Sequence, residues 1–246
     1  MTADTSPTAP ADFTYASIPM GDAVYATMRA TMRLVCGVIL DGLLSVEGAE
    51  NVPRHGGLLV VSNHVGTIDP PLLGAYLPRP DTYFMAKSEY FEHPVGRLFI
   101  AGYHAFPVVR GTADRTALRH ALKLLTEGHA VVLYPEGHRS PDGNLQRALP
   151  GAGFLARTAG VPVLPVGLWG TSRVLPIGAR WPRRAPIHVR FGEAAPIPTV
   201  DAHGRRLSSQ QIADLLMLRV AAVLPRTRRG VFADGAAGAT APPPAV

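Results

Sequence analysis

Short apolar runs alternate along this chain with segments whose apolar residues are spaced as in helices. The runs with the length and composition of strands are 43–47, 57–62, 82–86, 105–109, 130–134, 162–168 and 186–191. Helix signals lie between them and begin at Asp69-Pro70, near Pro94, at Thr112, near Gly151 and near Ser208. Because strands alternating with helices are typical of an α/β sandwich, we expect one domain in which helices flank a mostly parallel, mixed sheet.

Residues 21–42 have the spacing of an amphipathic helix, with an apolar stripe flanked by Arg29 and Arg33. Two interpretations are open. The stripe can pack on the domain, or the helix can lie at a membrane interface with Tyr25 and the methionines in lipid and the arginines toward headgroups. No apolar run reaches the roughly 18 residues that a membrane span needs, and the acidic start of the chain is not typical of a signal peptide.

The two ends of the chain have compositions typical of disordered tails. Residues 1–20 are rich in Pro, Thr, Ala and Asp, and residues 226–246 contain few bulky apolar side chains. We therefore expect the folded part to lie between these two segments.

Composition narrows the classes of partner. With 246 residues, 47% of them hydrophobic, the chain is long enough for one domain with a full core. The net charge of +6 indicates an anionic partner, such as a phosphorylated substrate, an acidic lipid or a nucleic acid. Cys36 is the single cysteine, which excludes a disulfide framework and a cysteine-based zinc site.

His64 and Asp69 are the first candidates for chemistry, because they follow the strand expected at 57–62. Functional residues of α/β proteins gather on loops beyond the carboxyl ends of strands. Asp69 is equally suited to be a helix N-cap before Pro70. The two side chains can meet only if residues 64–68 form a turn, which Gly66 permits. The carboxylate would then hold one imidazole nitrogen and leave the other free as a base.

A nucleophile belonging to the protein itself is not evident. The sequence has no Gly-x-Ser-x-Gly elbow, and Cys36 falls within the N-terminal helix pattern. A His–Asp pair without Ser or Cys suits activation of a hydroxyl on the substrate, and therefore group transfer. Arg110 and Arg139 follow two other expected strands, and Gly137 permits a sharp turn beside Arg139. Guanidinium groups at these strand ends suit the binding of a phosphate. The alternative interpretation is an ordinary turn in which Arg139 is solvated.

Four sequence blocks, in order, resemble the motifs of the glycerolipid acyltransferases, the 1-acylglycerol-3-phosphate acyltransferase family. Asn63-His64-x4-Asp69 is similar to the first motif, and residues 102–110 (GYHAFPVVR) are similar to the second. Residues 134–140 (YPEGHRS) resemble the third motif, and residues 161–166 (VPVLPV) resemble the fourth. No single block is decisive, but four in this order are highly specific.

The resemblance implies an acyltransferase domain at 43–225, held on the cytoplasmic face of the cell membrane by the N-terminal helical segment as a peripheral protein. The domain would transfer an acyl chain from acyl-ACP or acyl-CoA to the free hydroxyl of 1-acyl-glycerol-3-phosphate (lysophosphatidate). The product would be phosphatidate, an intermediate of phospholipid biosynthesis. No metal or other cofactor is expected, and no nucleic acid partner.

The resemblance also implies roles for individual residues. His64 would be the general base and Asp69 its partner. The residues expected to bind substrate are Asn63, Lys87, Arg110, Glu136, Gly137, Arg139 and Pro165. Of these, the arginines with Glu136 and Gly137 would shape the phosphate and glycerol site, and Pro165 would shape the acyl or substrate pocket.

Two positions depart from the family pattern. His138 stands where the family usually has Thr, and residues 148–151 (ALPG) replace the frequent Phe-Lys-x-Gly. Both bear on the headgroup of the acceptor, which could be another lysophospholipid or an amino-acid lipid. Two other classes of protein also remain open. One is a non-catalytic lipid- or nucleotide-binding protein, and the other is a phosphohydrolase that holds a metal ion with side chains of the first and third motifs.

Overall fold

A computed structural model of the chain describes residues 21–92, 100, 102–109, 114–176, 179 and 181–235. The start of the helix expected near Pro94 lies outside these residues. So do the expected N-terminal tail and the chain from residue 236 onward.

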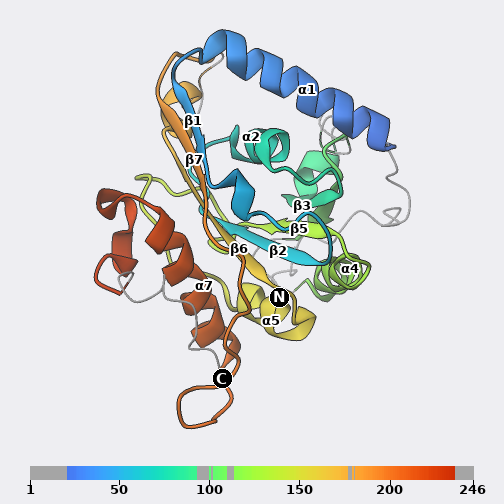
Figure 1. Cartoon of the computed structure of the whole chain (residues 1–246), viewed down its shortest axis with the longest axis vertical. Coiled ribbons are helices and arrows are strands. Elements are labelled where there is room, and N and C mark those ends of the chain that lie inside the picture. Colours follow the sequence, from blue (N-terminus) through green and yellow to red (C-terminus); the bar gives the residue numbers. More distant parts are fainter. Residues whose placement is uncertain are drawn as a thin grey trace, which may run out of the picture.

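A seven-stranded sheet forms the centre of the protein, with the strand order β1-β7-β6-β2-β5-β3-β4 (Figure 1). The strands are β1 (Leu44–Glu47), β2 (Leu58–Ser62), β3 (Thr82–Lys87), β4 (Ala105–Val108), β5 (Ala130–Leu133), β6 (Val163–Trp169) and β7 (Ile187–Phe191). β7 is antiparallel to β6, whereas every other neighbouring pair is parallel. The predicted strands are confirmed to within one residue at each end, and so is the mostly parallel, mixed sheet.

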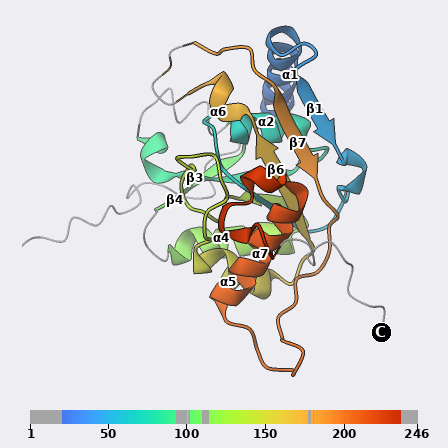
Figure 2. The same cartoon turned by 90° about the vertical axis from the view of Figure 1, so that its left-hand side faces the viewer.

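Two layers of helices cover the sheet, one on each face (Figures 1 and 2). The layers contain α1 (Asp22–Ile39) and α2 (Asp69–Tyr76) on one face, and α4 (Arg115–Thr126), α5 (Pro150–Ala159) and α7 (Ser209–Val223) on the other. β2 is buried along its whole length. Leu59 and Val61 pack toward α4, α5 and α7, whereas Leu58 and Val60 pack toward α1 and α2. Burial on both faces explains why this strand is a continuous apolar run in the sequence.

The helix expected from Thr112 begins instead at Arg115, because Asp114 caps it. One carboxylate oxygen of Asp114 accepts hydrogen bonds from the backbone N–H groups of Thr116 (3.1 Å) and Ala117 (2.9 Å). The other oxygen accepts from the backbone N–H of Val109 at 3.0 Å. The cap therefore also ties the end of β4 to the start of α4.

α1 packs on α2 with its arginines turned inward. Arg29 donates to the carbonyl of Leu77 (2.6 Å) and Arg33 to the carbonyl of Ala75 (2.7 Å), at the C-terminal end of α2. Cations at this end satisfy free carbonyls and complement the helix dipole. Tyr25, 1% exposed, also faces the domain. The expectation that Tyr25 enters lipid is therefore wrong, because its ring is buried against the domain. No helix of the described residues could cross a membrane.

Residues 226–235 fold onto the domain, so the expectation of a disordered tail from 226 was wrong for this part. Two short 3-10 helices, η3 (Arg226–Arg228) and η4 (Gly230–Phe232), follow α7. Phe232 is 8% exposed and joins the core beside α7. The backbone N–H of Leu145 donates to the carbonyl of Arg228 at 3.0 Å. One aromatic side chain thus anchors a segment whose other residues are too small or polar for a recognisable apolar pattern.

Arg79 is a fully buried arginine that ties together the loops preceding β2, β3 and β5. Its guanidinium binds both carboxylate oxygens of Asp81, at 2.7 and 2.6 Å. It also donates to the carbonyls of Pro53 (3.0 Å), Gly56 (3.0 Å) and Gly128 (2.9 Å). One side chain therefore satisfies backbone acceptors from two loops at the amino-terminal edge of the sheet.

Replacing Arg79 by Ala should lower the free energy of unfolding by about 3 kcal/mol, the lower end of the effect of removing one partner from a buried ion pair, because Asp81 is partly exposed. The reason is that Asp81 and three carbonyls would lose their donor. Urea unfolding followed by circular dichroism measures the change. Arg205→Ala is the control, because the exposed guanidinium of Arg205 pairs with Asp201 at the surface and should contribute little. Equal losses in the two variants would contradict this role for Arg79.

Candidate active site

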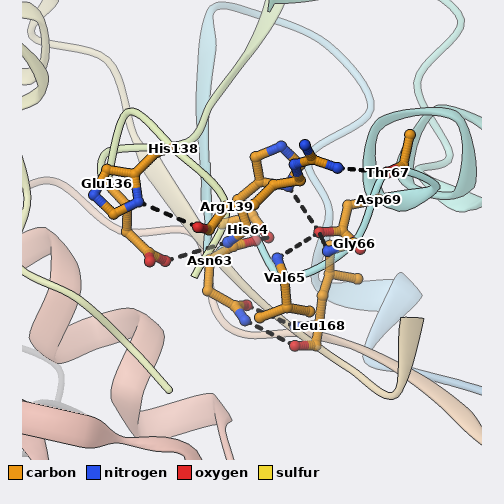
Figure 3. A network of polar contacts seen from close by, with 11 residues as sticks. Asn63, His64, Val65, Gly66, Thr67, Asp69, Glu136, His138, Arg139 and Leu168 are labelled. Carbon is orange, nitrogen blue, oxygen red and sulfur yellow. Dashed lines mark hydrogen bonds and ion pairs between the residues drawn. The ribbon is translucent and has the colours of Figure 1, made fainter. Parts of the chain in front are cut away.

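The loops that follow β2 and β5 bring polar side chains of the first and third motifs together at one edge of the sheet. β2 and β5 are neighbouring parallel strands, so their carboxyl ends lie side by side. The backbone N–H of Ser140 donates to the carbonyl of His64 at 2.7 Å. The backbone N–H of His64 donates to Glu136 Oε1 at 3.2 Å (Figure 3). These bonds fix the two motifs relative to each other.

His64 and Asp69 meet across a turn that the carboxylate itself holds (Figure 3). His64 Nδ1 lies 2.8 Å from Asp69 Oδ2, and the same oxygen accepts from the backbone N–H groups of Val65 and Gly66, each at 2.7 Å. Asp69 is the first residue of α2 and makes no side-chain capping bond to that helix. The N-cap explanation is therefore wrong, because the carboxylate points back into the preceding turn.

The hydrogen bond to Asp69 determines which nitrogen of His64 can act as a base. An ionised carboxylate accepts hydrogen bonds and donates none, so Nδ1 carries the hydrogen and Nε2 carries the lone pair. The side chains of His64 and Asp69 are 8% and 0% exposed. Exclusion of water from the pair strengthens its electrostatic interaction. In the described part of the chain, no group of three or more His, Cys, Asp or Glu side chains is arranged to hold a metal ion.

Tyr134 connects His64 to an apolar cavity. Its ring stacks on the imidazole, with centroids 4.4 Å apart and planes 28° apart. The cavity has a volume of about 360 Å³, within the roughly 300–1,000 Å³ of small-molecule sites. Apart from Tyr134, its lining is largely apolar and includes Met85, Val108, Leu118, Leu133 and Leu149. Burial, and then the charge of Asp69, raises the pKa of the Tyr134 hydroxyl well above its ordinary value, so this wall of the cavity stays uncharged.

Gly137 forms part of the cavity wall and makes the sharp turn predicted for it. Its φ is 73°, in the left-handed region that favours glycine. A Cβ at this position would come within 2.6 Å of Leu149 Cδ1. Leu149 is held against this turn by a hydrogen bond of 2.8 Å from its backbone N–H to the carbonyl of Pro135. A side chain at position 137 would therefore displace Leu149 from the cavity wall.

Glu136 is a buried carboxyl group placed against the backbone of the 64–69 turn. It is 1% exposed, and its Oε2 makes no hydrogen bond within the described residues. Burial raises its pKa to about 8, although backbone hydrogen bonds from His64 and Gln146 act in the opposite direction. Glu136 therefore keeps its proton near pH 7. Through these two backbone hydrogen bonds, Glu136 connects the turn that carries His64 with the loop that leads to Leu149.

Arg139 reaches over the 64–69 turn. Its Nη1 donates to Thr67 Oγ1 at 2.7 Å, so a residue inside the His-x4-Asp spacing orients the guanidinium (Figure 3). Arg139 is partly exposed, which leaves donors of its planar group accessible to an anion. His138 is exposed, and its Nδ1 lies 3.3 Å from the carbonyl of Arg139.

The structure does not bring Asn63 and Pro165 to the cavity. The Asn63 amide is paired with the backbone of Leu168 through two hydrogen bonds of 2.8 Å, one in each direction. It therefore extends the pairing of β2 with β6 where substrate binding was expected. Pro165 lies within β6 opposite Val61 and is not among the residues lining the cavity.

Lys87 and Arg110 are the remaining residues expected to bind substrate. Lys87 ends β3, and its Nζ lies 2.6 Å from Glu89 Oε1. This ion pair is partly exposed, and no contact of Lys87 with the 64–69 turn is found within the described residues. Arg110 lies outside them.

Neither Tyr134 nor Thr67 was among the predicted site residues. Tyr134 is the residue that directly follows β5, and an aromatic residue at a strand end beside polar motif residues was a usable signal. Thr67 gave no such signal, because only the tertiary contact with Arg139 distinguishes it from a spacer residue.

Comparisons with known proteins show which family the sequence resembles. The sequence model of the Acyltransferase family matches residues 44–169. A 1-acyl-sn-glycerol-3-phosphate acyltransferase of Bacillus subtilis is 33% identical over 148 residues, which are 57% of this chain and 73% of that protein. A chloroplastic protein of the same name from Arabidopsis thaliana is 31% identical over 140 residues, 55% of this chain and 38% of that protein. Among these relatives, the chain thus spans from over a third to about three quarters of their length.

A solved structure shares the fold. The crystal structure of the 1-acyl-sn-glycerophosphate (LPA) acyltransferase PlsC from Thermotoga maritima matches with a TM-score of 0.62 and 26% sequence identity. The match covers 78% of this chain and 75% of that chain. The mixed sheet with flanking helices is therefore an architecture that a solved acyltransferase also has.

The buried carboxyl of Glu136 should make stability depend on pH. Between about pH 4.5 and 8 the folded state keeps the Glu136 proton, whereas the unfolded chain has lost it. Because the folded state binds more protons in this window, stability should fall as pH rises, by about 1.4 kcal/mol per pH unit.

Thermal unfolding of wild type and Glu136→Gln between pH 5 and 9 measures this dependence. The variant keeps a neutral side chain at every pH. The melting temperature of wild type should therefore fall by about 5–10 °C more than that of the variant between pH 6 and 8. Parallel curves would show that Glu136 is already ionised in the folded protein.

Proposed function

The chain belongs to the Acyltransferase family, and on this premise we propose that it acylates the free hydroxyl of 1-acyl-sn-glycerol-3-phosphate to give phosphatidate. The names of its relatives and of its structural neighbour support this acceptor. The observation that carries the proposal is the buried His64–Asp69 pair, which shares Tyr134 with an apolar cavity. A base and an apolar compartment side by side suit an alcohol acceptor and a fatty acyl donor.

His64 acts as the general base in the proposed reaction. The acceptor hydroxyl loses its proton to Nε2 while its oxygen attacks the thioester carbonyl, so a C–O bond forms as the C–S bond breaks. Asp69 keeps Nδ1 protonated and stabilises the imidazolium that results. The proton on Nε2 then passes to the departing thiolate. All atoms and charges balance without a covalent intermediate on the protein.

The apolar cavity receives the acyl chain of the donor, acyl-CoA or acyl-ACP. Asp114 is the charged residue in its lining, and its two oxygens are occupied by the backbone N–H groups of Val109, Thr116 and Ala117. The remaining surface offers little to a polar group, whereas burial of methylene groups is favourable by about 0.8 kcal/mol each.

Arg139 binds the phosphate of the acceptor. Its guanidinium is held by Thr67, two residues from Asp69, so a phosphate bound there lies beside the base. Charge-assisted hydrogen bonds from arginine are the strongest that a phosphate makes with a side chain. Arg110 is a second candidate for this role because of its place in the second motif.

The substrates imply work at a membrane surface, and α1 supplies a suitable face. Leu34 and Val38 on α1 are 68% and 69% exposed, and Val35 is 42% exposed. With the exception of Arg33, the exposed positions of α1 after its first residue carry no charge. We therefore infer a peripheral protein on the cytoplasmic face of the membrane, with the outer face of α1 in contact with lipid.

His64→Ala should lower turnover by roughly 10²- to 10⁴-fold, as expected when a general base is removed. The assay supplies lysophosphatidate and a panel of acyl thioesters in mild detergent, and mass spectrometry detects phosphatidate. His203→Ala, which removes an exposed imidazole from a distant turn, is the matched control and should retain activity. Near-normal turnover of His64→Ala, with an unchanged melting temperature, would remove His64 as the base.

Gly151→Leu should shift the preference toward shorter acyl chains. Gly151 lines the cavity, and a Cβ at this position meets no atom within 4 Å, so a larger side chain has room beside the cavity without disturbing the backbone. Competition between thioesters of different length measures the preference, with Gly151→Ala as the small-volume control. An equal loss for all chain lengths would contradict the assignment of the cavity to the acyl chain.

A further inference from the structure

The outer face of α1 is apolar and supplies little positive charge to a membrane, because Arg33 is its one exposed cation. The two arginines at its centre, Arg29 and Arg33, donate to carbonyls of α2. Membrane-surface helices usually combine an apolar face with basic residues that contact anionic headgroups. A membrane contact that includes α1 therefore needs cations from another element of the fold.

The residues before β7 supply an exposed aromatic ring and two cations. Trp181 is 80% exposed, the highest value among the large hydrophobic side chains that the structure describes as exposed. Arg183 and Arg184 are also exposed, and neither forms an ion pair with an acidic side chain of the described residues. Nothing in this stretch therefore neutralises the two guanidinium charges.

Hydrogen bonds hold this segment beside the C-terminal end of α1. Arg184 Nη2 donates to the carbonyl of Asp41 at 3.3 Å, and the backbone N–H of Ile187 donates to the carbonyl of Leu43 at 2.8 Å. Figures 1 and 2 both show the start of β7 next to the end of α1. The exposed Val38 lies three residues before Asp41, so the apolar face and the basic segment adjoin.

We propose that Trp181, Arg183 and Arg184 form a second membrane contact, which binds the interface of an anionic bilayer. Tryptophan favours the headgroup level, where its ring is partly in lipid and its N–H is hydrated. Arginines near the surface are attracted to anionic lipids within a Debye length. α1 contributes the apolar part of the contact, and this segment contributes the charge and the interfacial anchor.

The second contact is connected to the catalytic turn by a short path. The backbone N–H of Arg183 donates to the carbonyl of Val174 at 2.7 Å, the last residue of α6 (Thr171–Val174). At the other end of α6, Thr171 packs so closely on Gly66 that a Cβ there would lie 2.7 Å from Thr171 Oγ1. α2, beneath α1, begins at Asp69 on the opposite side of the turn. Both contacts are therefore linked to the turn that carries His64, one through α6 and the other through α2.

The purpose of the second membrane contact rests on the proposed function: the contact would hold His64, the proposed base, near lysolipids in the bilayer. The contact itself can be tested without catalysis. Vesicle binding reports on the segment alone, whereas phosphatidate formation in detergent reports on the reaction. A failure of one proposal is therefore distinguishable from a failure of the other.

Trp169→Phe provides a direct spectroscopic test, because it leaves Trp181 as the sole tryptophan of the chain. On addition of vesicles of phosphatidylcholine with phosphatidylglycerol, its emission should shift to shorter wavelength and be quenched by brominated lipid. Trp181→Ala should also weaken cosedimentation with these vesicles. An unshifted emission spectrum on vesicles that carry bound protein would overturn the proposal.

Charge is tested with two pairs of exposed arginines. Arg183→Gln with Arg184→Gln should weaken binding to anionic vesicles roughly 30-fold, about fivefold per arginine. Arg115→Gln with Arg119→Gln removes the same charge from α4, on the other face of the sheet from α1, and should leave binding unchanged. Equal losses in both pairs would mean that only net charge matters. Leu34→Ser with Val38→Ser should weaken binding to neutral and anionic vesicles alike, which separates the α1 contribution from that of the arginines.

Discussion

The carboxylate of Asp69 is the centre on which the site depends. One oxygen collects the imidazole of His64 and two backbone N–H groups, so a single acceptor fixes both the shape of the turn and the tautomer of the base. Because Asp69 also begins α2, the position of the turn is set by a helix packed under α1. The chemistry is thus held by regular structure and not by a free loop.

Around this centre, two uncharged groups contact His64, the proposed base. Tyr134 stacks on His64 and stays protonated because it is buried, and Glu136 keeps its proton near pH 7 for the same reason. The carboxylate of Asp69 binds the imidazole, and the guanidinium of Arg139 reaches the same turn through Thr67. An apolar cavity and a cation match the two substrates of the proposed reaction: the cavity suits the fatty acyl chain of the donor, and the cation suits the phosphate of the alcohol acceptor.

The same division between apolar and charged elements recurs at the proposed membrane surface. The arginines of α1 donate hydrogen bonds to carbonyls at the C-terminal end of α2, and Leu and Val side chains form the exposed face of α1. The segment with Trp181 adds the cations that α1 lacks and is hydrogen-bonded to α6, which packs against the catalytic turn. The proposed membrane contact is therefore connected to the 64–69 turn through a few short contacts between neighbouring elements.

The sequence by itself determined the strands and the candidate residues. Runs such as 57–62 are apolar because both faces of the strand are buried, and this burial is visible as a pattern. Only the tertiary structure decided what the polar residues contact. Asp69 can cap a helix or turn back to His64, Arg29 can face lipid or α2, and Asn63 can bind a ligand or β6; each choice has the same local sequence. The outcome depends on which acceptor a distant element places within hydrogen-bonding distance, and that is a property of packing.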